Sequence, residues 1–455
     1  MAAALCLYLL LLLLFGWHTR NQMVRHTNSA FREYLIAGGR QGAIWITFSI
    51  LASVIGGSAV FGSVDLVAKV GFPAFWWLGV GSAGLLVQAW LLSARVRELQ
   101  AFTLPHVAFL TMGETARMVI SIVICLAWTG VVAGQFVALF QFTAILPGFD
   151  TPIARLGIAA VIIMYTAAGG QISVIRTDMV QFLFILCGIG LTCQILYGLE
   201  NAAPSLWIGR IQFLNERFGA NDLARLALLA GAAFFIGPDI MSRNLAAKDG
   251  KTARMATFCA AGLLAVFALL MTFVGVWINA HQASVPGTNP LAVLIRNSLP
   301  APAGIVLSLG LISALVSSAD TCIMSAAGIL EHDILKGKNL RRLRLFVVLF
   351  GSLSYSMAIL RPDIIGLLLS AYSVYTPGVV IPLFFAIMFH KKRRLNRPFW
   401  YLGGLAGGGL GFFGSAAGMS SLPLWGMAAA LALSLASLLW SEPAVSAAAP
   451  APITT

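Results

Sequence analysis

Long apolar runs follow one another along the whole chain and are separated by short polar segments. They lie at 1–17, 42–68, 72–93, 118–146, 153–168, 174–197, 223–242, 255–279, 303–328, 343–360, 364–389, 399–418 and 423–440. A helix that crosses the hydrocarbon core of a membrane needs about 20 apolar residues. The pattern therefore predicts an all-α polytopic membrane protein with about 13 transmembrane helices.

Basic residues gather in four short segments between apolar runs, at 20–40, 243–254, 336–344 and 391–397. Because Lys and Arg accumulate on the cytoplasmic side of membranes, these segments are predicted to be inside. With the N-terminus outside and the C-terminus inside, all but seven of the 29 Lys and Arg lie in cytoplasmic segments. Asp239 and Arg243 close the seventh run and are predicted at the cytoplasmic interface.

Composition narrows the class of protein. Charged residues make up 10% of the chain and hydrophobic residues 59%, which leaves too few charges for the surface of a soluble protein. The net charge is +13, but its spread over several loops argues against a nucleic-acid partner. The six Cys all lie in apolar runs without metal-binding spacing, and the chain has no P-loop. Neither an enzyme nor a protein with a bound cofactor is predicted.

Two of the apolar runs contain residues that interrupt helices. The run at 51–63 carries three glycines among serines, and the seventh run contains Gly231, Gly237 and Pro238. A broken helix in a membrane is tolerated where its free carbonyls line a cavity or bind an ion. Breaks five spans apart indicate an inverted-repeat secondary transporter with its site near the midplane. Close packing through glycine explains either break alone.

The ninth run carries a polar helix face. Ala314, Ser317, Ser318 and Thr321 are spaced so that they share one side of a helix, and Asp320 lies beside them. Oxygen ligands of this kind suit a hard alkali cation, whereas small residues also line tight helix interfaces in membranes. Both interpretations stay open. Asp178, at the start of the sixth run, is either an interfacial helix cap or part of an ion pathway.

Four segments resemble the sodium:solute symporter family. They are 32–40 (REYLIAGGR), 169–181 (GGQISVIRTDMVQ), 239–254 (DIMSRNLAAKDGKTAR), and 317–320 (SSAD) continuing to 331–333 (EHD). They occur in the family's order and span about 30–390. The resemblance implies the five-plus-five inverted repeat of the leucine-transporter type, with discontinuous first and sixth core helices. The repeats are expected at 42–197 and 223–389, with an extra helix at 1–18, two more at 399–440 and a short cytoplasmic tail at 441–455.

The resemblance also implies the ion sites. The main sodium site is expected to use backbone carbonyls at the first helix break together with carbonyl and hydroxyl groups of the ninth run: Ala52, Ile55, Ala314, Ser317 and Ser318. A second site, for a cation or a proton, is expected at Asp178, Ser317, Asp320 and Thr321. Asp320 is an acid where several relatives place a serine.

The substrate pocket is less well defined. The first-helix wall is mostly apolar, and no mid-span Lys or Arg is expected to bind a carboxylate, so backbone amides at the helix break would do so. The candidate residues are Gly56, Gln88, Gln135, Phe234, Phe235 and Tyr372. A large sugar is disfavoured because it needs many polar side chains. An amino acid or a short carboxylate is favoured.

The sequence thus predicts a sodium-coupled symporter in the cytoplasmic membrane that imports a small organic solute by alternating access. Its partners are the solute, sodium and the lipid bilayer, and the monomer is the expected functional unit. Two alternatives remain. A proton could replace sodium at Asp178 or Asp320, or the chain could be a transport-inactive sensor, although its short tail leaves no room for a signalling domain.

Overall fold

The computed structural model describes residues 2–24, 30–144, 146, 148–199, 211–281, 290–360, 364–419 and 421–443. Within these ranges the regular elements are helices apart from a small antiparallel strand pair, β1 (Arg393–Arg394) with β2 (Glu442–Pro443). Helices satisfy their backbone hydrogen bonds internally, which an apolar environment requires. Most of the predicted tail at 441–455 lies outside the described residues.

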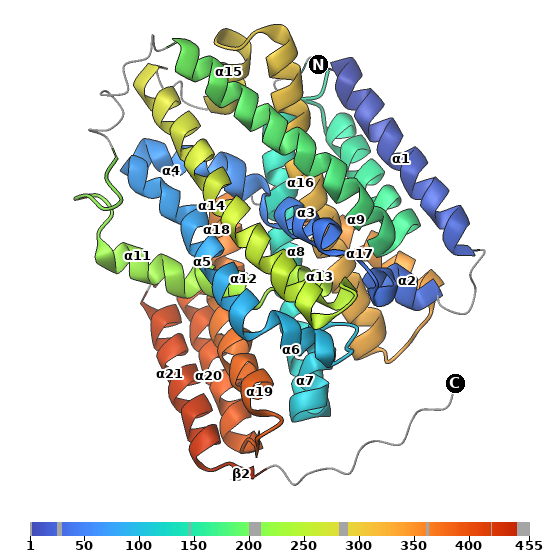
Figure 1. The fold of residues 1–455 in the computed structure, drawn as a ribbon, viewed down its shortest axis with the longest axis vertical. Coiled ribbons are helices and arrows are strands. Elements are labelled where there is room, and N and C mark those ends of the chain that lie inside the picture. The colour runs from blue at the N-terminus through green and yellow to red at the C-terminus, as the bar shows by residue number, and fades with distance from the viewer. Residues whose placement is uncertain are drawn as a thin grey trace.

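The first half of the chain contains one N-terminal helix and a series that begins with a broken helix (Figure 1). Its helices are α1 (Ala2–Val24), α2 (Ala30–Ile36), α3 (Ala43–Val54), α4 (Ser63–Val70), α5 (Trp76–Leu91), α6 (Ser93–Glu98), α7 (Leu104–Met112), α8 (Glu114–Thr143) and α9 (Pro152–Leu199). Short turns lie between some of them: η2 (Ala37–Gly39), η3 (Ser58–Gly62) and η4 (Phe72–Phe75).

The second half also begins with a broken helix and ends with two further helices. Its elements are α11 (Ala220–Leu226), η5 (Ala227–Gly231), α12 (Ala232–Phe235), α13 (Pro238–Ala246), α14 (Gly250–His281), α15 (Pro290–Asn297), α16 (Ala301–Ile329), η6 (Leu330–Ile334), α17 (Leu340–Leu360), α18 (Ile364–Tyr375), η7 (Thr376–Val380), α19 (Ile381–Phe389), α20 (Arg397–Ala416) and α21 (Leu422–Leu439).

Among the described residues, nine helical segments are long and apolar enough to cross a membrane, and the bent pair α3–α4 brings the number to ten. The other predicted spans correspond to α1, to the glycine-rich α20 and to one half of α9. With 48 residues, α9 is about 72 Å long, more than twice the hydrocarbon core of a bilayer. Gly170 divides it, because its φ of 61° and ψ of −167° are not helical.

Both predicted helix breaks are present. The axes of α3 and the segment after it differ by 64°, and Ile55 at the break has φ −88° and ψ 80°. The second break lies between α12 and α13, where the backbone of Ile236 is not helical and that of Gly237 is extended. Pro238 then begins α13, as suits a residue without an N–H to donate. The exact limits of the two repeats stay a prediction.

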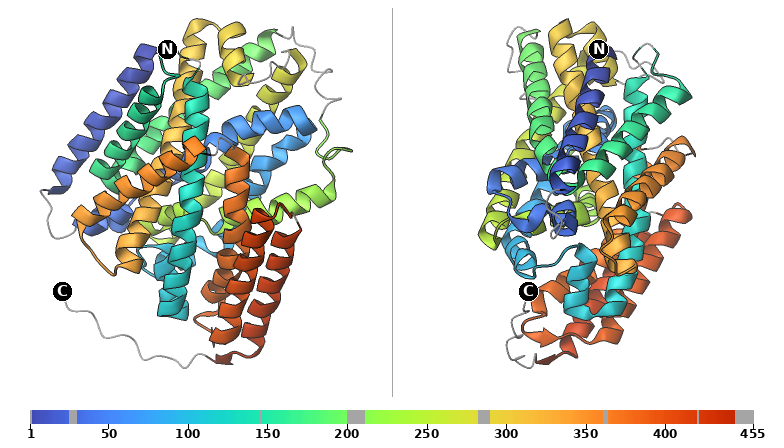
Figure 2. Two further views of the ribbon diagram at one scale, coloured as in Figure 1. Left: turned by 180° about the vertical axis from the view of Figure 1, so that it is seen from behind. Right: turned by 90° about the vertical axis from the view of Figure 1, so that its right-hand side faces the viewer.

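Helix α16 occupies the interior, where it packs against α3, α8 and α9. The N-terminal α1 packs on α9, whereas α20 and α21 pair with each other at the opposite end of the molecule (Figures 1 and 2). Large apolar side chains cover the outer surface, among them Ile153, 83% exposed, and Leu126, 72% exposed. Such a surface suits lipid and would be unfavourable in water.

Candidate functional site

Two hydroxyl groups of α16 contact the broken end of α3. Ser317 Oγ donates to the Ala52 carbonyl at 2.8 Å, and Ser318 Oγ donates to the Ser53 carbonyl at 2.8 Å. The last carbonyls of a helix have no partner within it, and here they are buried, where an unpaired carbonyl costs free energy. The two serines therefore satisfy the helix end and join α3 to α16.

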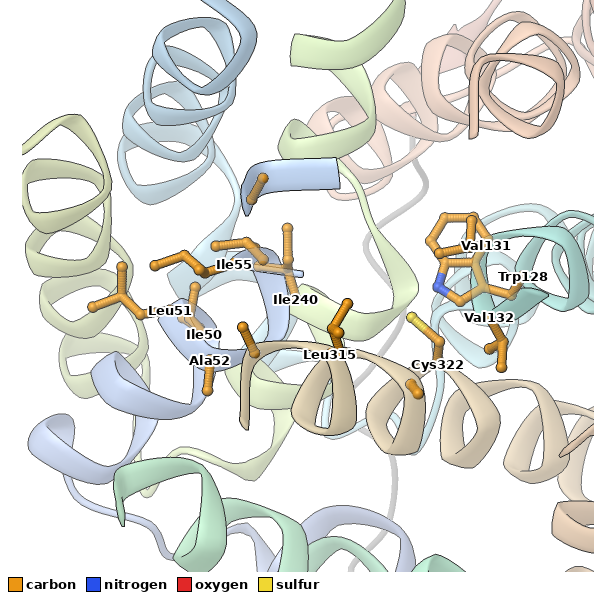
Figure 3. Close-up of a cluster of buried hydrophobic side chains, with 14 of the residues drawn as sticks. Ile50, Leu51, Ala52, Ile55, Trp128, Val131, Val132, Ile240, Leu315 and Cys322 are labelled. Atoms are coloured by element: carbon orange, nitrogen blue, oxygen red, sulfur yellow. The ribbon is translucent and has the colours of Figure 1, made fainter. Parts of the chain in front are cut away.

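Four of the five residues expected to bind sodium lie together in this arrangement. Ser317 Oγ is also 3.2 Å from the Ala314 carbonyl, and Ser318 Oγ is 3.4 Å from that of Ala52. Ile55 lies at the break itself, and Figure 3 shows its side chain within a cluster of buried hydrophobic residues that also includes Ala52 and Leu315. Carbonyl and hydroxyl oxygens are ligands that hard cations prefer.

Ser53 is a member of this group that the sequence interpretation did not single out. Its carbonyl accepts from Ser318, and its hydroxyl lies 3.4 Å from Thr321 Oγ1. The alternation of serine and glycine in the 51–63 run was the available signal. The side chain of Ser53 thus links the carbonyl group at the break to a second polar cluster.

That second cluster is built around Arg243. Its guanidinium lies 3.1 Å from Asp178 Oδ2, 2.5 Å from Thr321 Oγ1 and 2.9 Å from Ser49 Oγ. Ser49 in turn donates to Asp178 Oδ2 at 2.5 Å. The cluster therefore joins α3, α9, α13 and α16 through buried polar side chains, and two of them carry opposite charges.

The prediction for Arg243 was wrong. It was placed at the cytoplasmic interface, and no basic residue was expected within the spans. The side chains of Arg243 and Asp178 are both 0% exposed, so Asp178 is no interfacial cap either. The ion pair joins residues 65 positions apart, and this contact cannot be seen from the local sequence around either one.

Asp320 lies at the edge of the cluster and is completely buried. Its Oδ1 accepts from Thr321 Oγ1 at 3.3 Å. Its Oδ2, like Oδ1 of Asp178, has no hydrogen-bond partner among the described residues. Three of the residues predicted for a second cation, Asp178, Asp320 and Thr321, thus lie in one cluster, and Arg243 lies among them. The fourth, Ser317, contacts the Ala52 carbonyl of α3 instead.

A cavity adjoins the first break. Two of its lining residues, Ser53 and Ser318, also belong to the candidate sodium site between α3 and α16. Four predicted substrate residues line it: Gly56, Gln135, Phe234 and Tyr372. The lining also includes residues that were not predicted, among them Trp128 on α8. Another is Asp239 on α13, which was placed at the cytoplasmic interface from the sequence. Figure 3 shows the Trp128 ring above Cys322 of α16.

Two predicted substrate residues lie elsewhere in the structure. Gln88 is fully buried on α5, with its Nε2 3.6 Å from the Met241 sulfur. Phe235 packs its ring against Phe384, with 5.4 Å between centroids. Neither belongs to the described lining of the cavity. Successive residues of a helix point in different directions, so Phe234 faces the cavity while Phe235 does not.

The chain is similar to several known transporters. Residues 34–407 match the model of the sodium:solute symporter family. High-affinity choline transporter 1 of Torpedo marmorata is 25% identical over 429 residues, which cover 85% of this chain and 72% of that protein. The sodium/proline symporter of Escherichia coli (strain K12) is 26% identical over 375 residues, covering 74% and 70%.

Two solved structures share the fold. A Na⁺-coupled sialic acid symporter, in a substrate-bound outward-open state, superposes with a TM-score of 0.79 at 16% identity and covers 97% of this chain and 98% of that one. A nucleobase-cation-symport-1 family transporter in a closed conformation gives 0.63 at 12% identity, with coverage of 89% and 93%. The predicted leucine-transporter-type fold is therefore confirmed. Because the family model matches most of its length, the chain belongs to the sodium:solute symporter family, whose members are multi-pass membrane proteins that couple sodium to solute transport rather than enzymes.

Proposed function

We propose that the chain imports a small organic solute together with sodium, which binds between the broken end of α3 and α16. The observation that carries this proposal is the pair of contacts from Ser317 and Ser318 to the Ala52 and Ser53 carbonyls. These oxygens belong to two different helices, so an ion held by both would favour the arrangement in which the helices stay together.

The solute would then bind in the adjoining cavity. Ser53 and Ser318 belong both to the lining of this cavity and to the proposed sodium site. The occupancy of one site would therefore affect the geometry of the other. A ligand shifts a conformational equilibrium only by its differential affinity for the two states. Sodium that fixes Ser318 would thereby raise the affinity of the cavity for the solute in the conformation that binds sodium. Sodium and solute would then leave together when the cavity opens inward.

The relatives indicate a small solute. Their names specify choline and proline, and the preference for an amino acid or a short carboxylate from the sequence stays a prediction. We also propose the orientation with the N-terminus outside, a location in the cytoplasmic membrane, and a monomeric functional unit. A second cation or a proton at Asp178, Ser317, Asp320 and Thr321 is the further coupling proposal. Since Arg243 is paired to Asp178, the charge left to bind it belongs to Asp320.

Sodium binding is tested directly with the purified full-length chain. We expect sodium to raise the melting temperature while potassium does not, and we expect Ser317→Ala/Ser318→Ala to abolish this difference. Ser308→Ala is the matched control, because Ser308 is buried on the same helix and its hydroxyl donates to its own helix, at the Gly304 carbonyl. The proposal fails if potassium stabilises equally or if the double variant keeps the full sodium response.

Coupling is tested in proteoliposomes loaded without sodium. Uptake of radiolabelled choline or proline should require an inward sodium gradient and should stop when the gradient is collapsed. Shifting the external pH at fixed sodium separates the proton alternative: uptake that follows the pH gradient without sodium would favour a proton at Asp320 or Asp178 over sodium.

A further inference from the structure

The charged groups of the cavity have one sign. Asp239 contributes a carboxylate, and the described residues that line the cavity include no Lys, Arg or His. The other polar side chains of the lining, such as Gln135, Ser58 and Tyr372, are neutral. Arg243 lies nearby in sequence, but its guanidinium is paired to Asp178 outside this lining. An anionic solute would therefore meet a carboxylate, and none of the described lining residues would offer it a positive side chain.

Backbone amides at the helix breaks are the other groups that could hold a carboxylate, since a helix N-terminus favours negative charge. At the first break, Gln135 Oε1 already accepts from the Gly57 N–H at 2.6 Å. At the second break, Asp239 places its own carboxylate in the first turn of α13, where the helix N-terminus favours negative charge. Both helix ends that border the cavity thus carry an acceptor from the protein itself.

Aromatic rings form walls of the cavity from three different elements. Trp128 comes from α8, Phe234 from α12 and Tyr372 from α18. Trp128 is 3% exposed and its ring packs edge-on against Tyr375, with 4.7 Å between centroids, so its orientation is fixed. The face of an aromatic ring attracts a cation, and several rings around a quaternary ammonium group are a common mode of recognition.

We propose that the solute is a small organic cation, a quaternary ammonium compound or an amine without a carboxylate, which pairs with Asp239 and contacts the rings of Trp128, Phe234 and Tyr372. This inference rests on the proposed function, because it specifies the solute of the same cavity. It also replaces the sequence-based preference for an amino acid or a short carboxylate, because Gln135 and Asp239 already place acceptors at the helix ends that were expected to bind a carboxylate.

The test compares ligands that differ in charge but little in shape. Binding of choline, its uncharged carbon isostere dimethylbutanol, betaine, proline and acetate is measured on the purified full-length chain in sodium and in potassium. We expect choline to bind in sodium and dimethylbutanol and acetate to bind at least tenfold more weakly. Betaine should also bind more weakly than choline, because its carboxylate would face Asp239.

Asp239→Asn is the diagnostic variant, because it removes the charge while keeping the size and polarity of the side chain. Its choline affinity should fall by roughly ten- to a hundredfold, the range expected for a lost charged partner. Asp249→Asn is the matched control: Asp249 accepts from the Thr252 N–H at the start of α14, at 2.7 Å, and does not line the cavity. Trp128→Leu should weaken choline binding more than Trp128→Phe does.

The outcomes separate this inference from the sodium proposal. If the protein responds to sodium but binds acetate or dimethylbutanol as well as choline, or does not bind choline, the substrate class is wrong and the sodium site stands. If choline binds equally in sodium and in potassium, the coupling proposal fails and the substrate class stands. Unchanged choline affinity in a folded Asp239→Asn variant that keeps its sodium response would overturn the role of Asp239.

Discussion

Replacement of Arg243 is the most direct test of the buried polar cluster. Its guanidinium lies 3.1 Å from Asp178 Oδ2, and both side chains are 0% exposed. At that separation the Coulomb attraction is about 5 kcal/mol for an effective dielectric constant of about 20. Removing one partner of a buried pair leaves the other charge uncompensated. We therefore expect Arg243→Gln to destabilise the protein by about 3–5 kcal/mol.

The double variant distinguishes the loss of a charge partner from the loss of packing. Asp178→Asn/Arg243→Gln leaves neither charge of the pair, so it should recover most of the stability that Arg243→Gln loses. Arg243→Lys should remain less stable than the unmodified chain. Its ammonium group keeps the charge but cannot reproduce the guanidinium fork that contacts Asp178, Thr321 and Ser49. Melting temperatures of the detergent-purified variants measure these differences. The reasoning is refuted if the melting temperature of Arg243→Gln equals that of the unmodified chain, or if it is not lower than that of the double variant.

The same variants test whether Arg243 takes the place of a second cation. The guanidinium contacts oxygens of Asp178 and Thr321, and both residues were predicted to bind that cation. With Arg243 present, Asp320 is the acid left to bind a second sodium, so we expect the main site to account for nearly all of the sodium stabilisation. Arg243→Gln frees these oxygens, so high sodium concentrations should restore part of its melting temperature through a second binding event. Identical sodium titrations in the two proteins would contradict this expectation.

Two further predictions concern the backbone of α9 and the pH dependence of α7. Gly170→Ala should destabilise the protein, because Gly170 has a φ of +61° and an added Cβ would lie 2.4 Å from the Tyr34 ring. At Gly157 on the same helix an added Cβ meets nothing within 4 Å, so Gly157→Ala should stabilise the protein by up to about 1 kcal/mol. Equal melting temperatures of the two variants would contradict the argument. Burial and the neighbouring His332 lower the pKa of His106 from 6.5 to about 4. Between these values the unfolded chain binds a proton that the folded chain does not, so stability should fall as the pH drops from 6.5 to about 4. His106→Gln should show a shallower pH dependence of the melting temperature, and an unchanged slope would rule out this contribution.

Much of the architecture follows from hydrophobic pattern and helix-breaking residues. Each predicted apolar run forms a helix among the described residues, and the breaks at Ile55 and Gly237 lie where glycine and proline interrupt the pattern. The serine face of α16 could be found because helical spacing places Ser317 and Ser318 on one side. Its partner was expected from the family resemblance, and the contact to Ala52 agrees with that expectation.

The composition of the cavity was less accessible from sequence. Phe234 and Phe235 are adjacent and chemically identical, yet only Phe234 lines the cavity. Which one does so depends on the rotation of a four-residue helix, α12, about its axis, and this is set by tertiary packing. Trp128 was one of 11 tryptophans in an apolar chain, so nothing in its neighbourhood distinguished a cavity wall from ordinary packing.

Arg243 and Asp239 show why charges at a helix break are hard to assign. Both lie on α13, only four positions apart, and one turn of a helix brings residues at this spacing to the same side. Nevertheless, the Asp239 carboxylate lines the cavity while the Arg243 guanidinium reaches Asp178 and Thr321. The first turn begins at the break and borders the cavity, whereas the next turn is enclosed by α3, α9 and α16. A charge in the first turn can therefore bind a ligand, and a charge one turn later is paired within the protein.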